Sequence, residues 1–274
     1  MVAVTLLAAC GDSTAVAQPG GDPTSCEAPT PERLKPVVLA TIPHPPDGFT
    51  EGLLIHDGTL FESSGLYNRS TLRAINPKTG AILAQADLPP EVFAEGLAEG
   101  SDGGLVQLTW KEGVAYRWAA QSLADLAGAT PSGTFYYVGE GWGLTRMGDA
   151  AFVMSDGSDE LTLRAPGDFS VLESNRVTRA DGPATQLNGL EWDGESIWAN
   201  RFQTDEIVRI RPDCWTVTRV ADISALHEDA TQVAARSGAK VYAANGIAHI
   251  PGTDEFLITG KLWPSIYTVR FVAA

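Results

Sequence analysis

A five-residue motif recurs along the chain, and its spacing constrains the fold more than any other feature. Two copies are nearly identical, Phe49-Thr50-Glu51-Gly52-Leu53 and Phe93-Ala94-Glu95-Gly96-Leu97. Three looser copies follow, with their glycines at Gly143, Gly189 and Gly246. The first four motif glycines are spaced by roughly 45 residues and the last interval is longer, which is typical of the blades of a β-propeller. The five copies therefore predict an all-β, five-bladed β-propeller.

Turn signals follow several of the motif copies. Asp57-Gly58, Asp102-Gly103 and Asp193-Gly194 each stand between two short apolar runs. Aspartate-glycine is a strong hairpin signal, because both central residues of the favoured turn have positive φ. Each of these motif copies is therefore expected to begin a strand whose hairpin partner comes next in the chain.

Two further segments complete the predicted ring. Apolar residues recur at helical spacing over 223–236, within the long last interval, and predict one short helical insertion before the last blade. Residues 37–40 are expected to pair with 266–269 near the C-terminus. Such pairing would close the ring and remove exposed sheet edges.

Composition limits the number of domains and the classes of partner. At 274 residues the chain is long enough for one all-β domain with a large core, which we assign to residues 37–274. The 34 acidic and 19 basic side chains leave a formal net charge of -15. This balance disfavours nucleic acid and anionic membrane surfaces as partners.

The first ten residues have the pattern of a signal with a lipobox. Residues 1–7 are apolar, and Leu7-Ala8-Ala9-Cys10 resembles the bacterial lipobox, in which the cysteine carries lipid. No positive charge precedes the apolar run, so an accidental match stays open. Residues 11–36 are rich in Gly, Pro, Ser, Thr and Ala and predict a flexible tether. These patterns predict an exported protein, either periplasmic or anchored to the membrane through lipid alone.

The cysteines are compatible with export. If Cys10 carries lipid, Cys26 and Cys214 remain, and in an oxidising compartment they could form a disulfide between the tether and the fourth blade. Two free thiols are the alternative. The 4 histidines are scattered and none stands at a metal-ligand spacing from another, so the sequence gives no sign of a zinc site.

The residue before each motif glycine is a candidate for a functional site. The first strand of a propeller blade lines the central channel, so these side chains should lie at or near the channel. They are Glu51, Glu95, Trp142, Asn188 and Asn245. Packing alone would favour one residue type at a repeated position. Polar groups that converge between aromatic walls are typical of a small-molecule site.

The predicted second strands end in residues that should lie at the same mouth of the channel. Trp110, Phe202 and Trp263 would add to the aromatic wall, and Lys261 is the one clear cation. Core packing is the alternative reading for each aromatic residue.

Further motifs accompany the two near-identical copies in a fixed order. They are Gly65-Leu66-Tyr67 with Ser70-Thr71-Leu72-Arg73, Gln107-Leu108-Thr109-Trp110, Gly139-Glu140-Gly141-Trp142-Gly143-Leu144, Ser155-Asp156-Gly157-Ser158, Leu187-Asn188-Gly189-Leu190-Glu191, Ile197-Trp198-Ala199-Asn200 and Thr259-Gly260-Lys261-Leu262-Trp263. Over about residues 41–272 the chain thereby resembles the plant-type, or type I, glutaminyl-peptide cyclotransferases (glutaminyl cyclases) of plants and bacteria. That family is known as a five-bladed propeller, which agrees with the count of motif copies.

The resemblance implies an activity and a role for each matching residue. The enzyme would convert the N-terminal glutamine of a peptide or protein into pyroglutamate and release ammonia. Glu95 would be the acid/base residue. The site would be lined by Trp110, Trp142, Asn188 and Lys261, with Glu51, Phe49 and Phe93 beside them.

The resemblance also implies that the chemistry needs no cofactor, and a structural cation in the central channel would be compatible with it. The chain departs from the family at two positions. Phe202 stands where the family commonly has tryptophan, which affects the shape of the pocket. Glu51 stands where the family often has glutamine, which places a charge next to the catalytic carboxylate.

Two other functions remain open at this point. A non-catalytic propeller that binds peptides would keep the aromatic walls but would not need Glu95. A metal-dependent propeller hydrolase or lactonase could use Glu51, Glu95, Asn188 and Asn245 as ligands from successive inner strands. Sensitivity to a chelator separates the metal-dependent enzyme from the cyclotransferase.

Overall fold

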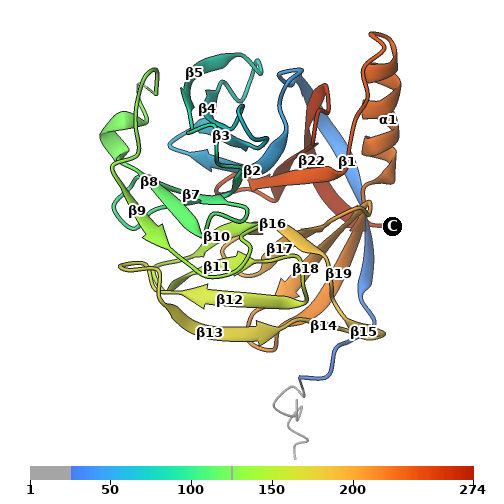
Figure 1. Cartoon of the computed structure of the whole chain (residues 1–274). Helices are drawn as coiled ribbons and strands as arrows, with labels where there is room; N and C mark the ends of the chain where they lie inside the picture. The colour runs from blue at the N-terminus through green and yellow to red at the C-terminus, as the bar shows by residue number, and fades with distance from the viewer. Residues whose placement is uncertain (1–25, 125) are drawn as a thin grey trace, which may run out of the picture.

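A computed structural model describes residues 26–124 and 126–274, and antiparallel β-sheets make up almost all of this part of the chain (Figure 1). The predicted lipobox and Cys10 lie outside the described residues. The prediction of an all-β fold with one short α-helix is confirmed for the residues described.

Three of the sheets are four-stranded meanders in chain order. The first contains β2 (Thr50–His56), β3 (Thr59–Ser64), β4 (Thr71–Ile75) and β5 (Ile82–Asp87). The second contains β6 (Ala94–Glu99), β7 (Leu105–Thr109), β8 (Val114–Trp118) and β9 (Gly133–Tyr136). The third contains β10 (Leu144–Met147), β11 (Ala151–Ser155), β12 (Glu160–Arg164) and β13 (Val171–Arg176).

The fourth sheet is 10-stranded and contains two further meanders. One consists of β16 (Leu187–Trp192), β17 (Ile197–Arg201), β18 (Glu206–Arg211) and β19 (Thr216–Asp222). The other consists of β20 (Ala244–His249), β21 (Glu255–Gly260), β22 (Ser265–Ala273) and, at its edge, β1 (Glu32–Pro43). The short strands β14 (Thr178–Arg179) and β15 (Gly182–Pro183) pair beside β19.

Strand β1 explains why the described residues form four sheets although the motif has five copies. It pairs antiparallel with β22 along most of its length, and Val38 lies opposite Val269, so the predicted pairing of the two chain ends is confirmed. Its first residues also run parallel to β19, with Glu32 opposite Arg219. This second pairing joins the last two meanders into one sheet.

The boundary predicted for the tether is wrong. Residues 32–36 were assigned to the tether, but β1 already begins at Glu32. Lys35 pairs with Val272 and Pro36 with Phe271, and Leu34 is only 4% exposed, packed in the core between β1 and the helix. Composition suggested a tether because this stretch is mostly polar, but its backbone forms hydrogen-bonded ladders on two sides.

The first strands of the five meanders contact one another in a ring. β2 contacts β6, β6 contacts β10, β10 contacts β16, β16 contacts β20, and β20 returns to β2. The recurring glycine permits this close approach: a Cβ on Gly52 would lie 2.7 Å from the backbone nitrogen of Leu97 in the next first strand. The spacing of the motif therefore corresponds to a structural repeat, the meander that follows each copy.

The one α-helix in the described part of the chain is α1 (Ser224–Ala235), which agrees with the predicted insertion over 223–236. A single 3-10 turn, η1 (Ala120–Ser122), follows β8. Leu226, Ala230 and Ala234 face the core, and Tyr267 of β22 donates a hydrogen bond to Asp229 at 2.8 Å. No helix in residues 26–124 or 126–274 is long and apolar enough to cross a membrane.

Cys26 and Cys214 are joined by a disulfide, with their Cα atoms 5.1 Å apart. Cys214 lies in the turn between β18 and β19, and Cys26 precedes β1. The bridge therefore ties the N-terminal end of the described chain to the edge of the sheet on which β1 pairs.

Candidate functional site

The residues before the motif glycines are brought together at one end of the ring. Glu51, Glu95, Asn188 and Asn245 are each the second residue of a first strand, and Trp142 lies two residues before β10. Hydrogen bonds join neighbouring first strands at this level. Gly96 N donates to Trp142 O at 2.7 Å, and Gly189 N donates to the Asn245 side chain at 3.2 Å.

Glu51 is fully buried and its charge is balanced. Both carboxylate oxygens lie 2.7 Å from Lys261 Nζ. Asn245 Nδ2 donates a third bond to the carboxylate, at 3.0 Å, and also contacts the Thr50 carbonyl at 3.2 Å. Burial raises the pKa of Glu51, while the Lys261 ammonium and these hydrogen bonds oppose the shift and favour the ionised form.

Glu95 has the same position in its motif copy but a different environment. It is 6% exposed, and its Oε2 atom is buried with no hydrogen-bond partner among the described residues. Burial raises the pKa of Glu95 well above its usual value, and the neighbouring Glu51 charge raises it further. The two carboxyls share a hydrogen bond that favours the protonated form of Glu95. The pair therefore combines a carboxyl whose charge Lys261 balances with one whose surroundings favour the protonated form.

Asn188 presents an acceptor to the same region. The residue is 2% exposed, and its Oδ1 has no hydrogen-bond partner in the part of the chain that the structure describes. Its backbone carbonyl is fixed by the Ser155 hydroxyl, which donates to it at 2.9 Å. A buried acceptor without a partner costs free energy, about 1–3 kcal/mol, unless a ligand supplies an N–H or O–H group.

Partly buried aromatic rings surround the two carboxyls. Phe93 contacts Phe49 edge to face, with ring centroids 6.3 Å apart, and contacts Trp110 at 5.6 Å. Trp142 contacts Phe202 at 5.4 Å. Lys261 closes the circle, because its Nζ lies 5.0 Å from the Phe49 ring and 5.1 Å from the Phe202 ring. The structure thus brings together the two glutamates, Lys261 and five of the aromatic residues predicted for the site.

Trp263 is the exception among the aromatic residues predicted for the wall. It is fully buried, stacks on His227 at 5.2 Å and donates its indole N–H to the Tyr242 carbonyl at 2.9 Å. Its place is in the core beside α1, so the prediction that it forms part of the wall is wrong. The core alternative applies to this residue, because its indole is enclosed by His227 and Tyr242.

Sequence reasoning missed several residues that shape the site. Tyr67 contacts Phe93 at 5.5 Å, and Tyr242, which follows α1, contacts Phe49 at 6.1 Å. Glu140 accepts hydrogen bonds from the indoles of both Trp110 and Trp142. The position of Glu140 inside a motif copy was a signal, but the recurring glycine singles out only the residue immediately before Gly143, which is Trp142.

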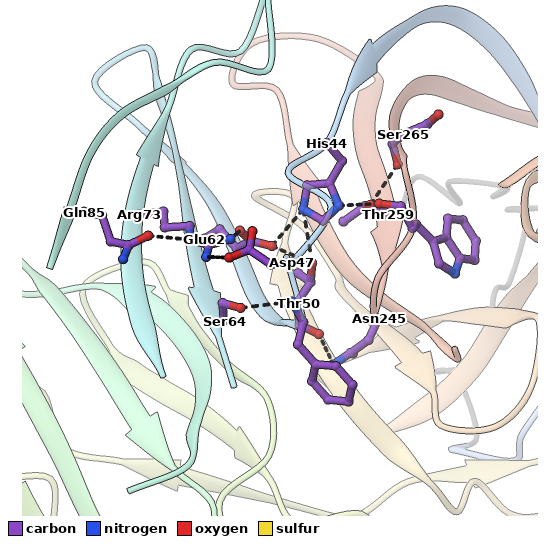
Figure 2. A network of polar contacts seen from close by, with 12 residues as sticks. His44, Asp47, Thr50, Glu62, Ser64, Arg73, Gln85, Asn245, Thr259 and Ser265 are labelled. Atoms are coloured by element: carbon purple, nitrogen blue, oxygen red, sulfur yellow. Dashed lines mark hydrogen bonds and ion pairs between the residues drawn. The ribbon is translucent and has the colours of Figure 1, made fainter. Parts of the chain in front are cut away.

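A buried network of charged side chains supports the strand that carries Glu51 (Figure 2). His44 Nε2 lies 2.8 Å from Glu62 Oε1, which also accepts the Thr50 hydroxyl at 2.6 Å. Arg73 lies 3.6 Å from Glu62 and donates to Asp47 at 2.8 Å. Burial opposes the charged form of His44, but Glu62 outweighs burial and raises the His44 pKa. The network fixes Thr50, the residue immediately before Glu51.

Metal ligation was a further alternative for the polar residues around the ring. Within residues 26–124 and 126–274, no three or more His, Cys, Asp or Glu side chains are placed to hold a metal ion together. Glu51 is engaged by Lys261 and Asn245, so this carboxylate already has cationic and amide partners.

Comparisons with known proteins point to one family. The family model described as glutamine cyclotransferase matches residues 5–271. The chain is 32% identical over 238 residues to the glutaminyl-peptide cyclotransferase of Arabidopsis thaliana, covering 86% of this chain and 71% of that protein. It also resembles the crystal structure of the glutaminyl cyclase of Myxococcus xanthus, with a TM-score of 0.78, 34% identity, and coverage of 89% of this chain and 99% of that one.

Proposed function

Because the chain belongs to the glutamine cyclotransferase family, we propose that it converts the N-terminal glutamine of peptides or proteins into pyroglutamate and releases ammonia at the Glu51–Glu95 site. The observation that carries the proposal is the pair of buried carboxyls, one balanced by Lys261 and the other with a raised pKa, inside a circle of aromatic rings. Such a pair suits proton transfer at neutral pH.

We further propose that the five meanders are the blades of a five-bladed β-propeller. The ring of contacts among β2, β6, β10, β16 and β20 supports this reading, because each of these first strands begins one meander. On this reading the 10-stranded sheet is two adjacent blades that share the strand pairing between β1 and β19. The site then lies at one mouth of the central channel.

The aromatic walls promote cyclisation by confining the glutamine side chain. The reaction is an attack of the substrate's α-amine on its own γ-carboxamide carbon, which forms the lactam C–N bond and breaks the C–N bond to the departing ammonia. Both reacting groups belong to one residue, so holding the side chain curled against its amine supplies proximity. Phe49, Phe93, Trp110, Trp142 and Phe202 would form the slot that selects this curled conformation.

Glu95 would move the proton between the two nitrogens. A free α-amine has a pKa of about 8, so most of the substrate arrives as an ammonium. The raised pKa of Glu95 brings it closer to that of the amine, which reduces the free energy needed to transfer the proton from the ammonium to the carboxylate. Glu95 then donates this proton to the departing nitrogen, which leaves as ammonia. The ring nitrogen loses its second proton to the released ammonia, which becomes ammonium, and Glu95 is again a carboxylate.

Three neighbouring residues would set the pKa of Glu95 or bind the substrate. Glu51 raises the Glu95 pKa by its charge, and Lys261 keeps Glu51 ionised. The resemblance implies that Lys261 lines the site, and in the structure its ammonium is held by Glu51. Asn188 Oδ1 would accept an N–H of the substrate carboxamide, because it is a buried acceptor without a partner among the described residues.

The proposal includes no cofactor, since every step is a proton transfer or an addition to a carbonyl carbon. A structural cation in the central channel remains a separate prediction, which a chelator tests.

We also propose export through the N-terminal segment, with Cys10 as the lipid attachment site and residues 11–31 as the tether. The Cys26–Cys214 bridge supports an oxidising compartment.

Ammonia release from a glutamine-initiated dipeptide tests the proposed function. The folded protein is expected to release one ammonia per pyroglutamate, to leave the N-acetylated dipeptide unchanged, and to act equally well with a chelator present. A folded protein that releases no ammonia from the free dipeptide would refute the activity and favour a peptide-binding role. Loss of turnover on chelation would refute the cofactor-free chemistry.

A further inference from the structure

One carboxylate oxygen accepts both indole N–H groups of the site. Glu140 Oε2 lies 2.8 Å from Trp110 Nε1 and 3.0 Å from Trp142 Nε1. Trp110 follows β7 of the second meander, and Trp142 precedes β10 of the third. The single atom therefore couples the orientation of two rings that come from different sheets.

Each of the two rings is also restrained on its other sides. Trp110 packs edge to face on Phe93, and Lys111 Nζ lies 3.7 Å from the Trp110 ring centroid. Trp142 packs on Phe202, and a Cβ on Gly157 would lie 2.7 Å from the indole. The bond from each indole N–H to Glu140 adds to these contacts, because rotation of a ring about its Cβ–Cγ bond would carry the N–H away from the carboxylate.

The Glu140 carboxylate is well suited to accept two hydrogen bonds. Its side chain is 39% exposed, and Lys111 Nζ lies 3.5 Å from Oε1. Although its partial burial opposes ionisation, the hydrogen bonds from Trp142 and Trp110 lower the pKa of Glu140 overall. An ionised oxygen forms stronger hydrogen bonds than a neutral one, and a carboxylate has room for two donors on one oxygen.

We propose that Glu140 is a positioning residue that holds Trp110 and Trp142 as the two facing walls of the glutamine slot, and so sets the width of the slot. This inference rests on the proposed function, because the two indoles are walls only if the substrate lies between them. Glu140 itself does not touch the reacting atoms. Its effect on the reaction passes through the two rings.

The position of the rings can be measured without any substrate. The protein has 7 tryptophans, so selective 15N labelling of the indoles gives a small set of N–H resonances, and Trp110→Phe and Trp142→Phe identify the two of interest. In Glu140→Ala both resonances are expected to move upfield as their hydrogen bonds are lost, while the others stay in place. Glu112→Ala removes a nearby carboxylate that does not bond either indole, and should leave both resonances in place.

Kinetics then connect the rings to the reaction. Displacing a wall by about 1 Å is expected to lower kcat/KM by roughly 100-fold in Glu140→Ala. Glu140→Gln keeps an acceptor oxygen without charge, and its kcat/KM should stay within about 10-fold of wild type because neutral hydrogen bonds are roughly half as strong. Glu140→Asp keeps the charge but withdraws the oxygen by one methylene, so it should resemble the alanine variant.

The outcomes separate this inference from the proposed function. Unmoved indole resonances in Glu140→Ala, or wild-type kcat/KM in both the alanine and aspartate variants, would overturn the positioning role. Equal losses in the glutamine and alanine variants would show that charge alone matters and would also overturn it. If the wild-type protein releases no ammonia, the proposed function is refuted. The proposed role of Glu140 in setting the width of a glutamine slot is then refuted as well. If Glu140→Ala does not fold, the aspartate variant decides both readouts.

Discussion

At the scale of single residues, two glutamates at the same position of a repeated motif differ in how strongly their surroundings favour the ionised form. Glu51 faces the ammonium of Lys261 and the amide of Asn245, which stabilise its charge. Glu95 has burial and the Glu51 carboxylate as its strongest influences, and both favour the neutral form. The repeat supplies two identical side chains, and their surroundings stabilise the charge of Glu51 and favour the protonated form of Glu95.

Glu51→Gln tests whether Glu51 sets the pKa of Glu95. The substitution removes a negative charge beside Glu95 and leaves the Lys261 cation without its partner. Both changes favour ionised Glu95, so its pKa falls. The acid limb of the kcat profile for a glutamine-initiated dipeptide is therefore expected to move to lower pH. An acid limb that stays in place or moves to higher pH would show that Glu51 does not control Glu95.

Gly65 is a second residue on which the site depends. A Cβ at this position would overlap the Phe93 ring and lie 2.9 Å from Glu51 Cγ. Gly65→Ala is therefore expected to displace both side chains, with a fall in kcat/KM of about 100-fold and a loss of about 1–3 kcal/mol in the free energy of unfolding. Steady-state kinetics and urea unfolding measure the two effects.

Gly167→Ala is the matched control for the Gly65 variant. A Cβ on Gly167 would meet nothing within 4 Å, and this glycine lies in the turn between β12 and β13. The control should keep wild-type kinetics and nearly wild-type stability. Equal activity in the two alanine variants would mean that the packing of Phe93 and Glu51 does not matter for turnover.

The motif made part of the site predictable. Glu51, Glu95 and Asn188 stand next to the repeated glycine, and a strand repeat places equivalent residues at equivalent heights. The partner of Glu51 was not predictable in this way, because Lys261 lies 210 residues away and at the end of a second strand. A motif copy contains Glu140, but its contacts depend on where two indole nitrogens point, which no spacing in the sequence reveals.

At the scale of secondary-structure elements, β1 is the strand that links the last two meanders. The apolar residues 37–40 predicted its pairing with β22. The parallel pairing with β19 could not be predicted, because Glu32, Arg33 and Lys35 resemble the polar tether before them. Strand pairing depends on backbone groups that are nearly the same in every residue. The residue types of a polar edge segment therefore do not identify it as a strand.

The disulfide should contribute to the stability of this region. The two cysteines are separated by 188 residues, and closing so long a loop restricts the unfolded chain by up to about 5 kcal/mol in the chain-entropy model. Cys26→Ser and Cys214→Ser are each expected to lower the free energy of unfolding by about 2–5 kcal/mol. Urea unfolding of the two variants, with and without reductant, measures the effect.

Reductant provides the internal control for this prediction. It should destabilise the wild-type protein and leave both serine variants unchanged, because they have no bridge to lose. The ammonia-release activity of the folded variants should remain, since the bridge lies at the edge of the sheet and away from Glu95. Wild-type stability that reductant does not alter would contradict a stabilising bridge.

At the scale of the whole molecule, the ring of first strands has two ends with different properties. The proposed active site lies at the end where these strands begin. At the end where they finish, a cavity of about 450 Å³ is lined by Glu99, Arg146, Glu191 and His249 among others. Glu191 accepts the backbone N–H of His249 at 2.9 Å and is 7% exposed. Burial, with a further contribution from Asp193, raises the pKa of Glu191 to about 8.

Glu191 should make the stability of the molecule depend on pH. In the unfolded chain its carboxyl ionises above about pH 4.5, while in the folded protein it stays protonated up to about pH 8. The unfolded state thus binds fewer protons in this window, and stability falls by about 1.4 kcal/mol for each unit of rising pH. Glu191→Gln does not titrate, so it should gain about 3 kcal/mol relative to wild type between pH 5 and pH 7.5.

Urea unfolding at several pH values measures this difference. Glu173→Gln, in which an exposed glutamate of β13 is replaced, is the control for removal of one charge from a chain with a net charge of -15. Its stability should follow that of the wild type across the window. A Glu191→Gln curve that runs parallel to the wild-type curve would contradict the raised pKa of Glu191.

The central claim is that Glu95 carries the proton in a cyclotransferase, and turnover of Glu95→Gln tests it most directly. Glu99→Gln, at the other end of β6, is the matched control. We expect the wild type and the control to release ammonia from a glutamine-initiated dipeptide and to form pyroglutamate, while folded Glu95→Gln loses at least about 100-fold in kcat. A folded Glu95→Gln protein with wild-type kcat would contradict the account.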